Sequence, residues 1–287
     1  MIREEPCKGK DVALIALGLR ALLSAIGTTP MYRQHYIAKG GTVLRLRSSK
    51  RMERLSTDLD LSGLSLSPGT AEDHRLFAAT IGRQATQILH DAYSKGAADI
   101  VVRFAEDSMG GRFDESDPDT VSYVVEVSAV LVPGGKTTFA RGKAYKIDLT
   151  CDEYLDLDLI EDLRVTSYGI SIDVRAYAPM QSIAEKMRAI LQKRRHYERT
   201  QNTGNWVPRH LFDLVLLRRL VTDEDLRRLP DLFRRKCACR QIPVDDHVRS
   251  LLLDERLLEA ARLKDRSRAD AAWAILRSLA DSAGLPA

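Results

Sequence analysis

Two aspartates separated by one residue, Asp58 and Asp60, carry the clearest chemistry in the sequence. Leu59 and Leu61 alternate with them, which predicts a strand with one buried face and both carboxylates on the other, about 7 Å apart along the chain. Carboxylates at that spacing can share divalent metals, and two Mg²⁺ ions can hold an attacking hydroxyl and a triphosphate. A solvated strand edge is the alternative interpretation of an isolated Asp-x-Asp pattern.

A glycine pair upstream could bring phosphate to those carboxylates. Gly40 and Gly41 follow a short extended run over residues 36–38 and precede a helical stretch. Backbone N–H groups at such a turn can approach phosphate oxygens closely because glycine has no side chain, and a helix N-terminus favours anions. Thr42 could add a hydroxyl donor. The alternative is a plain structural turn.

Later charged positions could complete such a site. Asp148, at the end of a strand, could present a third carboxylate to the metals or simply cap the next turn. Lys186 lies among apolar residues of a helix, and its ammonium could contact a triphosphate or extend to solvent. Arg209 and Asp213 are four residues apart on a helix, where a surface ion pair is the alternative to a role in the site.

The elements that must position these residues are those of an α/β fold. Apolar periodicity predicts helices over residues 11–27 and 71–95, and β-branched runs predict strands over 98–105, 120–131, 143–150 and 170–177, with a turn at 133–136. The acidic run after Asp148 reads as a solvated loop or helix start. Beyond residue 179 only helices are expected, over 180–197, 208–220, 223–238, 245–263 and 268–283. We therefore expect a mixed β-sheet flanked by helices in residues 1–178 and a helical C-terminal domain in residues 179–287.

Composition is that of an ordinary globular protein, with 287 residues, 44% hydrophobic and 29% charged. The formal net charge of +4 conceals segregation, because a basic block over residues 33–54 and another over 186–240 flank acidic stretches. The longest apolar stretch, residues 12–26, contains Arg20 and is too short to span a bilayer, so we expect a core helix and a cytoplasmic protein without a membrane segment.

Four cysteines are too few for a disulfide framework in a chain of this length, which favours reduced thiols. Cys237 and Cys239 with His247 suggest zinc only weakly, because a fourth ligand and the usual two-residue spacing are missing. Buried thiols are the preferred interpretation.

In their order along the chain, the motifs resemble the AbiEii/AbiGii toxin family, a type IV toxin group within the polymerase-beta-like nucleotidyltransferase superfamily. The resemblance covers about residues 30–220 and is carried by four segments: Lys39-Gly40-Gly41-Thr42, Arg54-Leu55-Ser56-Thr57-Asp58-Leu59-Asp60, Ala184-Glu185-Lys186, and Arg209-His210-Leu211-Phe212-Asp213. Two departures stand out. The segment between Gly41 and Asp58 is longer than in compact nucleotidyltransferases, which predicts a basic loop over residues 47–54 near the site, and His210 stands where several relatives carry an acid.

The resemblance implies a nucleotidyltransferase that moves a nucleoside monophosphate from an NTP to an acceptor with Mg²⁺ or Mn²⁺. It also implies a tRNA 3′ end as acceptor and a cognate antitoxin as partner. The alternatives are an acceptor hydroxyl on a small molecule or protein, or a module that binds nucleotide or antitoxin without turnover. The implied roles are nucleotide binding by Lys39, Gly40, Gly41, Thr42 and Arg209, metal binding by Asp58, Asp60 and Asp148, and catalysis by Asp58, Asp60, Lys186 and Asp213.

Overall fold

A computed structural model describes residues 10–48, 58–64, 70–92, 100–104, 120–127, 130–131, 137–138, 145–151, 153–200 and 208–285. The chain divides into two compact units. The first, here called the sheet unit, comprises residues 1–152 and 161–176; the second, the helical unit, comprises residues 153–160 and 177–287. The short segment 153–160 thus belongs with the helices, although it lies between two strands in the sequence.

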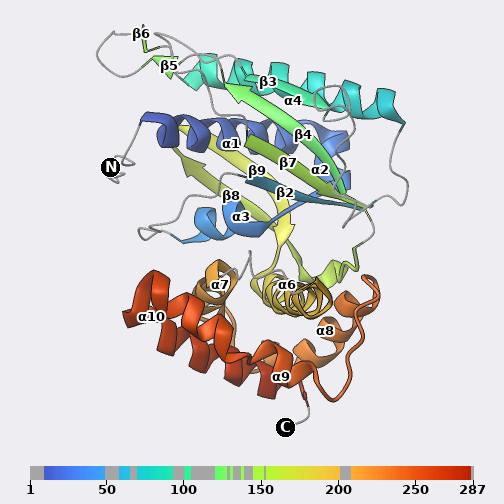
Figure 1. Cartoon of the computed structure of the whole chain (residues 1–287). Helices are drawn as coiled ribbons and strands as arrows, with labels where there is room; N and C mark the ends of the chain where they lie inside the picture. The colour runs from blue at the N-terminus through green and yellow to red at the C-terminus, as the bar shows by residue number, and fades with distance from the viewer. Residues whose placement is uncertain are drawn as a thin grey trace. The chain divides into compact units, whose positions relative to one another are not determined.

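In the part of the chain that the structure describes, seven strands form one mixed sheet in the order β3-β4-β7-β2-β1-β9-β8 (Figure 1). These strands are β1 (Tyr36–Lys39), β2 (Asp58–Gly63), β3 (Ile100–Phe104), β4 (Thr120–Val127), β7 (Tyr145–Thr150), β8 (Ile160–Ser167) and β9 (Ile170–Tyr177). Strand β2 pairs parallel with β7 and antiparallel with β1, and β1 pairs parallel with β9. Two short strands, β5 (Val130–Leu131) and β6 (Thr137–Thr138), pair separately.

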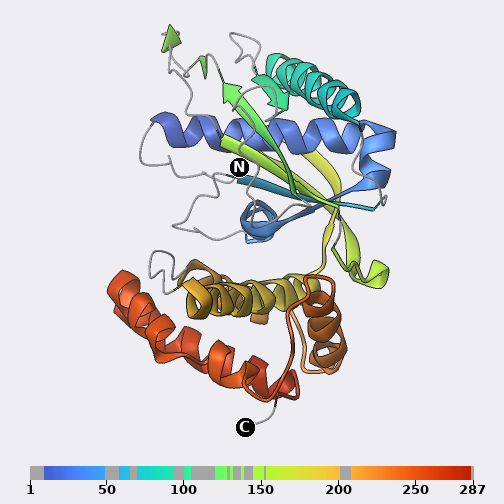
Figure 2. The same cartoon turned by 45° about the vertical axis from the view of Figure 1, so that its right-hand side comes forward.

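Alternation along the central strands separates an apolar face of the sheet from a polar one. The buried side includes Leu59 and Leu61 of β2, Ile147 and Leu149 of β7, and Tyr123 of β4, each at most 2% exposed. These residues share one core with the helices α1 (Lys10–Thr28) and α4 (Ala71–Ala92), which run beside the sheet in Figures 1 and 2. The residues between them on the same strands therefore face the opposite side.

Short helices flank strand β1 at both ends. Helix α2 (Pro30–His35) begins with a proline after the extended Thr29, a position where the missing N–H costs nothing. Helix α3 (Gly40–Arg47) begins directly after β1. The expected core helix, the strand–turn–helix order and the Asp-x-Asp strand are all present.

The helical unit consists, among the residues described, of α6 (Pro179–Thr200), α7 (Pro208–Arg218), α8 (Leu229–Ala238), α9 (Val248–Leu252), α10 (Glu255–Ser282) and the short 3₁₀ turns η1 (Leu157–Leu159) and η3 (Asp225–Arg228). Helix α6 packs against α7, α8 and α9, and α10 packs against α7. None of the helices described in either unit is long and apolar enough to cross a membrane.

One strand was not expected from the sequence, and one expected helix was wrong. The described part of the acidic run, residues 153–159, forms a loop and the turn η1, as expected. Strand β8 begins directly after it, and its acids Glu161 and Asp162 form ion pairs with Arg47 and Arg33 of the sheet unit. The helix expected over residues 245–263 is instead broken at Leu253, after which the Asp254 side chain accepts the backbone N–H of Arg256 and starts α10. Helix α10 then continues to Ser282 across a kink at Asp265. The turn expected at residues 133–136 lies outside the described residues.

Candidate active site

The polar face of the sheet carries a row of charged residues across β1, β2 and β7. Asp60 lies in register with Lys39 of β1 on one side and with Asp148 of β7 on the other. Asp58, two residues earlier on β2, faces the same side and is in register with Lys146. The three aspartates are only partly buried, whereas their neighbours Leu59 and Leu61 are fully buried. One face of the sheet thus brings the Asp-x-Asp pair and Asp148 onto adjacent strands.

The glycine turn lies against Asp60. Gly40 has a φ of +75°, and a Cβ atom at this position would lie 1.8 Å from Asp60 Oδ2. Both the backbone conformation and the space therefore require glycine. The strand β1 ends and helix α3 begins at this residue, so the start of the helix is held beside the carboxylate. The expectation that the Gly-Gly turn and the aspartates converge is confirmed for Gly40 and Asp60.

Two hydroxyl groups tie this region together. Thr42 is buried, and its hydroxyl donates to the backbone carbonyl of Asp58 at 2.8 Å, which fastens α3 to β2. Ser122 of β4 donates to Asp148 Oδ1 at 2.6 Å and orients that carboxylate. The Thr42 hydroxyl proton points to the strand, so a direct contact of this hydroxyl with phosphate stays a prediction.

Hard oxygen donors such as these suit Mg²⁺, which is commonly bound by one or two carboxylates together with substrate phosphates. Within the described ranges, no group of three or more His, Cys, Asp or Glu side chains is arranged to hold a metal ion. Metal binding by Asp58 and Asp60, and the contribution of Asp148 as a third ligand, stay predictions.

The helical unit contains a second set of the expected residues. Lys186 Nζ lies 3.0 Å from Asp213 Oδ2, with the side chains only 12% and 3% exposed. The same ammonium is 3.4 Å from His210 Nδ1. Lys186 is therefore held by α7 and does not extend freely to solvent. Asp213 is engaged by this lysine across two helices, so the simple surface pair between Arg209 and Asp213 is not the arrangement found.

Sequence reasoning missed Lys193, a further cation near Lys186 and Arg209. Lys193 lies two helical turns after Lys186 on α6, hence on the same helix face. Partial desolvation lowers the pKa of Lys193, and the positive charges of Arg209 and Lys186 lower it further. Neither Lys193 nor Arg209 has an ion-pair partner among the residues described. The seven-residue spacing between Lys186 and Lys193 was the signal that could have revealed this cluster, because residues seven apart share one face of a helix. Cations gathered on one face repel each other, and a bound anion relieves that repulsion.

The basic loop expected after α3 is only partly described. Arg47, at the end of α3, is largely buried and pairs with Glu161 at 2.6 Å. Burial lowers the pKa of Arg47, while the Glu161 carboxylate acts to raise it. Arg47 is thus engaged within the sheet unit, and residues 49–54 of the expected loop lie outside the described residues.

The cysteines of the helical unit differ from each other. Cys237 is fully buried, and burial raises its pKa to about 12. Cys239 is exposed, so the expectation of two buried thiols holds only for Cys237. The Cys239 sulfur accepts the backbone N–H of Tyr154 at 3.4 Å and donates to the Lys236 carbonyl at 3.2 Å. These contacts assign the cysteine pair to local structure.

Comparisons with known proteins add the family. A family model described as the nucleotidyl transferase AbiEii toxin of type IV toxin–antitoxin systems matches residues 22–278. Among solved structures, the chain is similar to the nucleotidyltransferase toxin MenT4 from Mycobacterium tuberculosis, with 18% identity over 93% of this chain and 94% of that one and a TM-score of 0.41. No curated protein matches the sequence. Because the family match covers most of its length, the chain belongs to the AbiEii family of nucleotidyltransferase toxins.

Proposed function

We propose that this chain transfers a nucleoside monophosphate from an NTP to the 3′ end of tRNA in a Mg²⁺-dependent reaction. Membership of the family establishes nucleotidyl transfer, an NTP substrate and an antitoxin partner. The acceptor, the metal and the residue roles are the proposal. The acceptor hydroxyl oxygen forms a bond to the α-phosphorus, the bond from that phosphorus to the bridging oxygen breaks, pyrophosphate leaves, and the hydroxyl proton passes to solvent.

The observation that carries the proposal is the close approach of Gly40 to the Asp60 carboxylate. A positive φ and a Cβ position 1.8 Å from Oδ2 leave no room for any side chain at residue 40. A triphosphate held by the N–H groups of Gly40 and Gly41 would therefore lie beside an acidic group. The carboxylates of Asp60 and Asp58 would repel a bare polyphosphate. A divalent cation between the carboxylates and the phosphates would remove this repulsion.

Asp58 and Asp60 would hold Mg²⁺, with Asp148 as a further ligand oriented by Ser122. Bound there, the metal supplies charge neutralisation for the α-phosphate and the leaving group. Lys39 lies in register with Asp60 and is 8% exposed, which suits a role as a fixed cation beside the nucleotide. The chain's own contribution is to hold these groups rigidly on adjacent strands, so that little reorganisation is needed during transfer.

In the helical unit, Lys186 and Arg209 would bind the triphosphate. Lys186 suits this role because its ammonium is a compact charge held in one direction by Asp213. Arg209 and Lys193 are exposed cations whose charges act on each other and on Lys186. Asp213 would complete the site by orienting the Lys186 amine.

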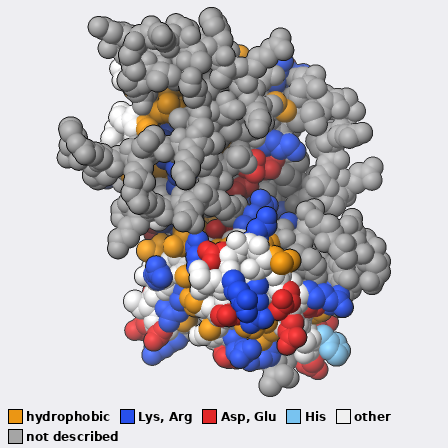
Figure 3. Space-filling view, turned by 60° about the vertical axis from the view of Figure 1, so that its left-hand side comes forward, with side chains coloured by type: hydrophobic (Ala, Val, Ile, Leu, Met, Phe, Trp, Pro, Cys, Tyr) orange, Lys and Arg blue, Asp and Glu red, His pale blue; other side chains and the backbone are white. Residues whose placement is uncertain are grey.

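A tRNA acceptor is supported by the family and by exposed basic residues of the helical unit. Arg219 and Arg234 are exposed in addition to Lys193 and Arg209. In Figure 3, Lys and Arg side chains are interspersed with Asp and Glu over the described surface. Contacts between the exposed cations and phosphates would weaken with added salt.

The experiment that tests the proposal supplies each α-labelled NTP with Mg²⁺ and total tRNA, and follows where the label goes. Label in tRNA that is lost with Asp58→Asn and Asp60→Asn supports the proposal. Label in protein or in a small product would replace tRNA by another acceptor. Label in tRNA that survives both substitutions would refute the metal assignment.

The role of Lys186 is tested in the same assay. Lys186→Ala should lower turnover roughly a hundredfold or more, because one lost charge contact to a transferring phosphoryl group typically has that effect. A melting curve measured in parallel should show that the variant is folded. Unchanged turnover would remove Lys186 from the site.

A further inference from the structure

A buried ionic cluster lies within the helical unit where α6 packs against α8, whereas Lys186 of α6 contacts α7. Its centre is Lys236 of α8, which is 0% exposed. The Lys236 ammonium lies 3.3 Å from Glu185 Oε2 and 3.5 Å from Glu153 Oε1, and it donates to the Tyr154 carbonyl at 3.1 Å. It also lies 4.7 Å from the centre of the Tyr177 ring. A buried cation is thus satisfied from several sides.

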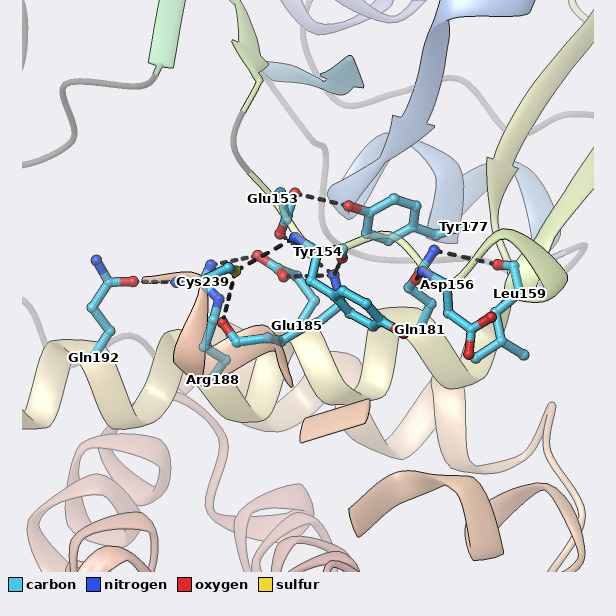
Figure 4. Close-up of polar contacts among 11 residues, drawn as sticks. Glu153, Tyr154, Asp156, Leu159, Tyr177, Gln181, Glu185, Arg188, Gln192 and Cys239 are labelled. Carbon is cyan, nitrogen blue, oxygen red and sulfur yellow. Dashed lines mark hydrogen bonds and ion pairs between the residues drawn. The ribbon is translucent and has the colours of Figure 1, made fainter. Parts of the chain in front are cut away.

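Glu185 is the member of this cluster that belongs to α6. Besides Lys236, its carboxylate binds Arg188, one turn along the same helix, and Arg188 in turn binds Gln192 (Figure 4). Burial acts to lower the pKa of Arg188, but the charge and hydrogen bond of Glu185 outweigh burial and raise it. The Glu185 carboxylate therefore has a cation on its own helix and a second cation on α8.

Helix geometry connects this cluster to the next residue in the sequence. Consecutive residues of an α-helix point about 100° apart. Glu185 contacts α8, whereas Lys186 contacts Asp213 and His210 of α7. A rotation of α6 that brought Lys186 away from Asp213 would also pull Glu185 out of its buried contact with Lys236. The two ion pairs thus join neighbouring residues of α6 to two different helices.

We propose that Glu185, held by Lys236 and Arg188, is a positioning residue that fixes the rotation of α6 and so directs Lys186 to Asp213 and to the triphosphate. This inference rests on the proposed role of Lys186 in triphosphate binding. Glu185 touches no reacting atom in this proposal and acts only through its neighbour in the sequence.

The first measurement follows the Lys186 amine itself. An amine-reactive acylating reagent, applied briefly and read by mass spectrometry, reports how accessible each lysine is. In the wild-type protein Lys186 should react slowly because its side chain is 12% exposed. Glu185→Gln should raise the rate several-fold, since the neutral amide no longer binds Lys236 as a charge. An unchanged rate would overturn the proposal, whatever happens to nucleotide binding.

A matched control uses an ion pair of the same spacing on the surface. Glu259 and Arg262 of α10 form a pair three residues apart, like Glu185 and Arg188, but with side chains 64% and 39% exposed. Glu259→Gln should leave Lys186 labelling unchanged. If Glu185→Gln fails to fold, Glu185→Asp keeps the charge and shortens the side chain by one carbon, and its labelling rate should still exceed that of wild type. A rate equal to wild type in a folded Glu185→Asp protein, with no folded Glu185→Gln, would overturn the proposal.

The second measurement is calorimetric binding of inorganic tripolyphosphate with Mg²⁺. Glu185→Gln should weaken binding roughly tenfold, as expected when the support of a binding residue is removed. In a Lys186→Ala background the same change should have no further effect, because the residue it positions is gone. Equal losses in both backgrounds would show a general structural effect and overturn the proposal. If Lys186→Ala alone leaves binding unchanged, the triphosphate role fails instead, while the labelling rates still decide whether Glu185 orients Lys186.

Discussion

The polar face of the sheet and the Lys236 cluster both gather charged side chains, but they do so in opposite ways. Around Lys236, two cations and two carboxylates are buried together, with Glu153 1% and Glu185 16% exposed. On the sheet, three partly exposed aspartates lie on adjacent strands, with Lys39 and Lys146 as their register neighbours. One set balances its charges in the interior, and the other places three partly exposed carboxylates on adjacent strands beside two lysines.

The difference separates a structural role from a binding role. Burying a charge costs free energy unless it is paired, so the Lys236 cluster is expected to be needed for folding. Like charges held close on a rigid sheet oppose folding, and such an arrangement is typical of a site that binds an opposite charge. The two regions should therefore respond to neutral substitutions with opposite effects on stability.

The largest effect on stability is expected from Lys236→Met. The methionine fills most of the lysine volume but leaves Glu153 and Glu185 without their buried partner. Breaking a buried pair in this way typically costs about 3–5 kcal/mol. Urea unfolding measures the loss, and Lys193→Met, at an exposed position of α6, is the control that should change stability by under about 0.5 kcal/mol. A loss below about 1 kcal/mol for Lys236→Met would mean that the cluster is not what holds this unit together.

On the sheet, Asp60→Asn should abolish most activity while the protein stays as stable as wild type or becomes slightly more stable. Removing one carboxylate relieves repulsion from Asp58 and Asp148 but takes away a metal ligand, with a loss of roughly a hundred- to a thousandfold in turnover, or about 2.7–4 kcal/mol. Asp173→Asn is the matched control and should leave turnover unchanged. Asp173 lies on β9 and forms an exposed ion pair with Arg33 of α2. A fall in melting temperature as large as that of Lys236→Met would contradict the distinction between the regions.

The sheet site could be predicted from the sequence because its signals are local. The alternation of Asp58 and Asp60 with leucines predicts that both carboxylates lie on the polar face of one strand. The glycine pair before a helical stretch predicts the turn between β1 and α3. The partner strand was within reach as well, since Asp148 ends a recognisable β-branched run. The contact between Gly40 and Asp60 then follows from strand pairing, which places Lys39 opposite Asp60.

The Lys236 cluster could not be predicted in the same way. Its ion pairs join Lys236 to Glu153 and Glu185, which are distant in the sequence, and no local pattern marks a lysine that is buried. Strand β8 was missed for a related reason. Its early residues Glu161 and Asp162 look like a solvated loop, yet β8 is at the edge of the sheet, where charged residues are common in strands.

Gly40→Ala tests whether the close approach to Asp60 matters for function, separately from backbone strain. A left-handed conformation costs an alanine about 1–2 kcal/mol, so stability should fall by that amount. Gly169→Ala provides the control, because Gly169 has a φ of +73° but nothing within 4 Å of its Cβ position. Gly40→Ala should lose at least as much stability as Gly169→Ala, and only Gly40→Ala should lose activity, since its Cβ displaces the Asp60 carboxylate. Equal activities in the two variants would show that the Gly40 contact has no part in the site.

The smallest expected effect concerns Ser122, and it decides whether Asp148 belongs to the metal site. Ser122→Ala removes the hydroxyl that donates to Asp148 Oδ1 at 2.6 Å. If Asp148 is a ligand, losing this orienting contact should weaken Mg²⁺ affinity about tenfold, with a stability change of about 1 kcal/mol. Ser24→Ala is the control, because the Ser24 hydroxyl donates at 2.6 Å to the Ser171 carbonyl in the same unit, where no acid is involved. Titration of NTP binding with Mg²⁺ separates the variants. The same Mg²⁺ affinity in both would leave Asp58 and Asp60 as the metal ligands and assign Asp148 to the structure of the sheet.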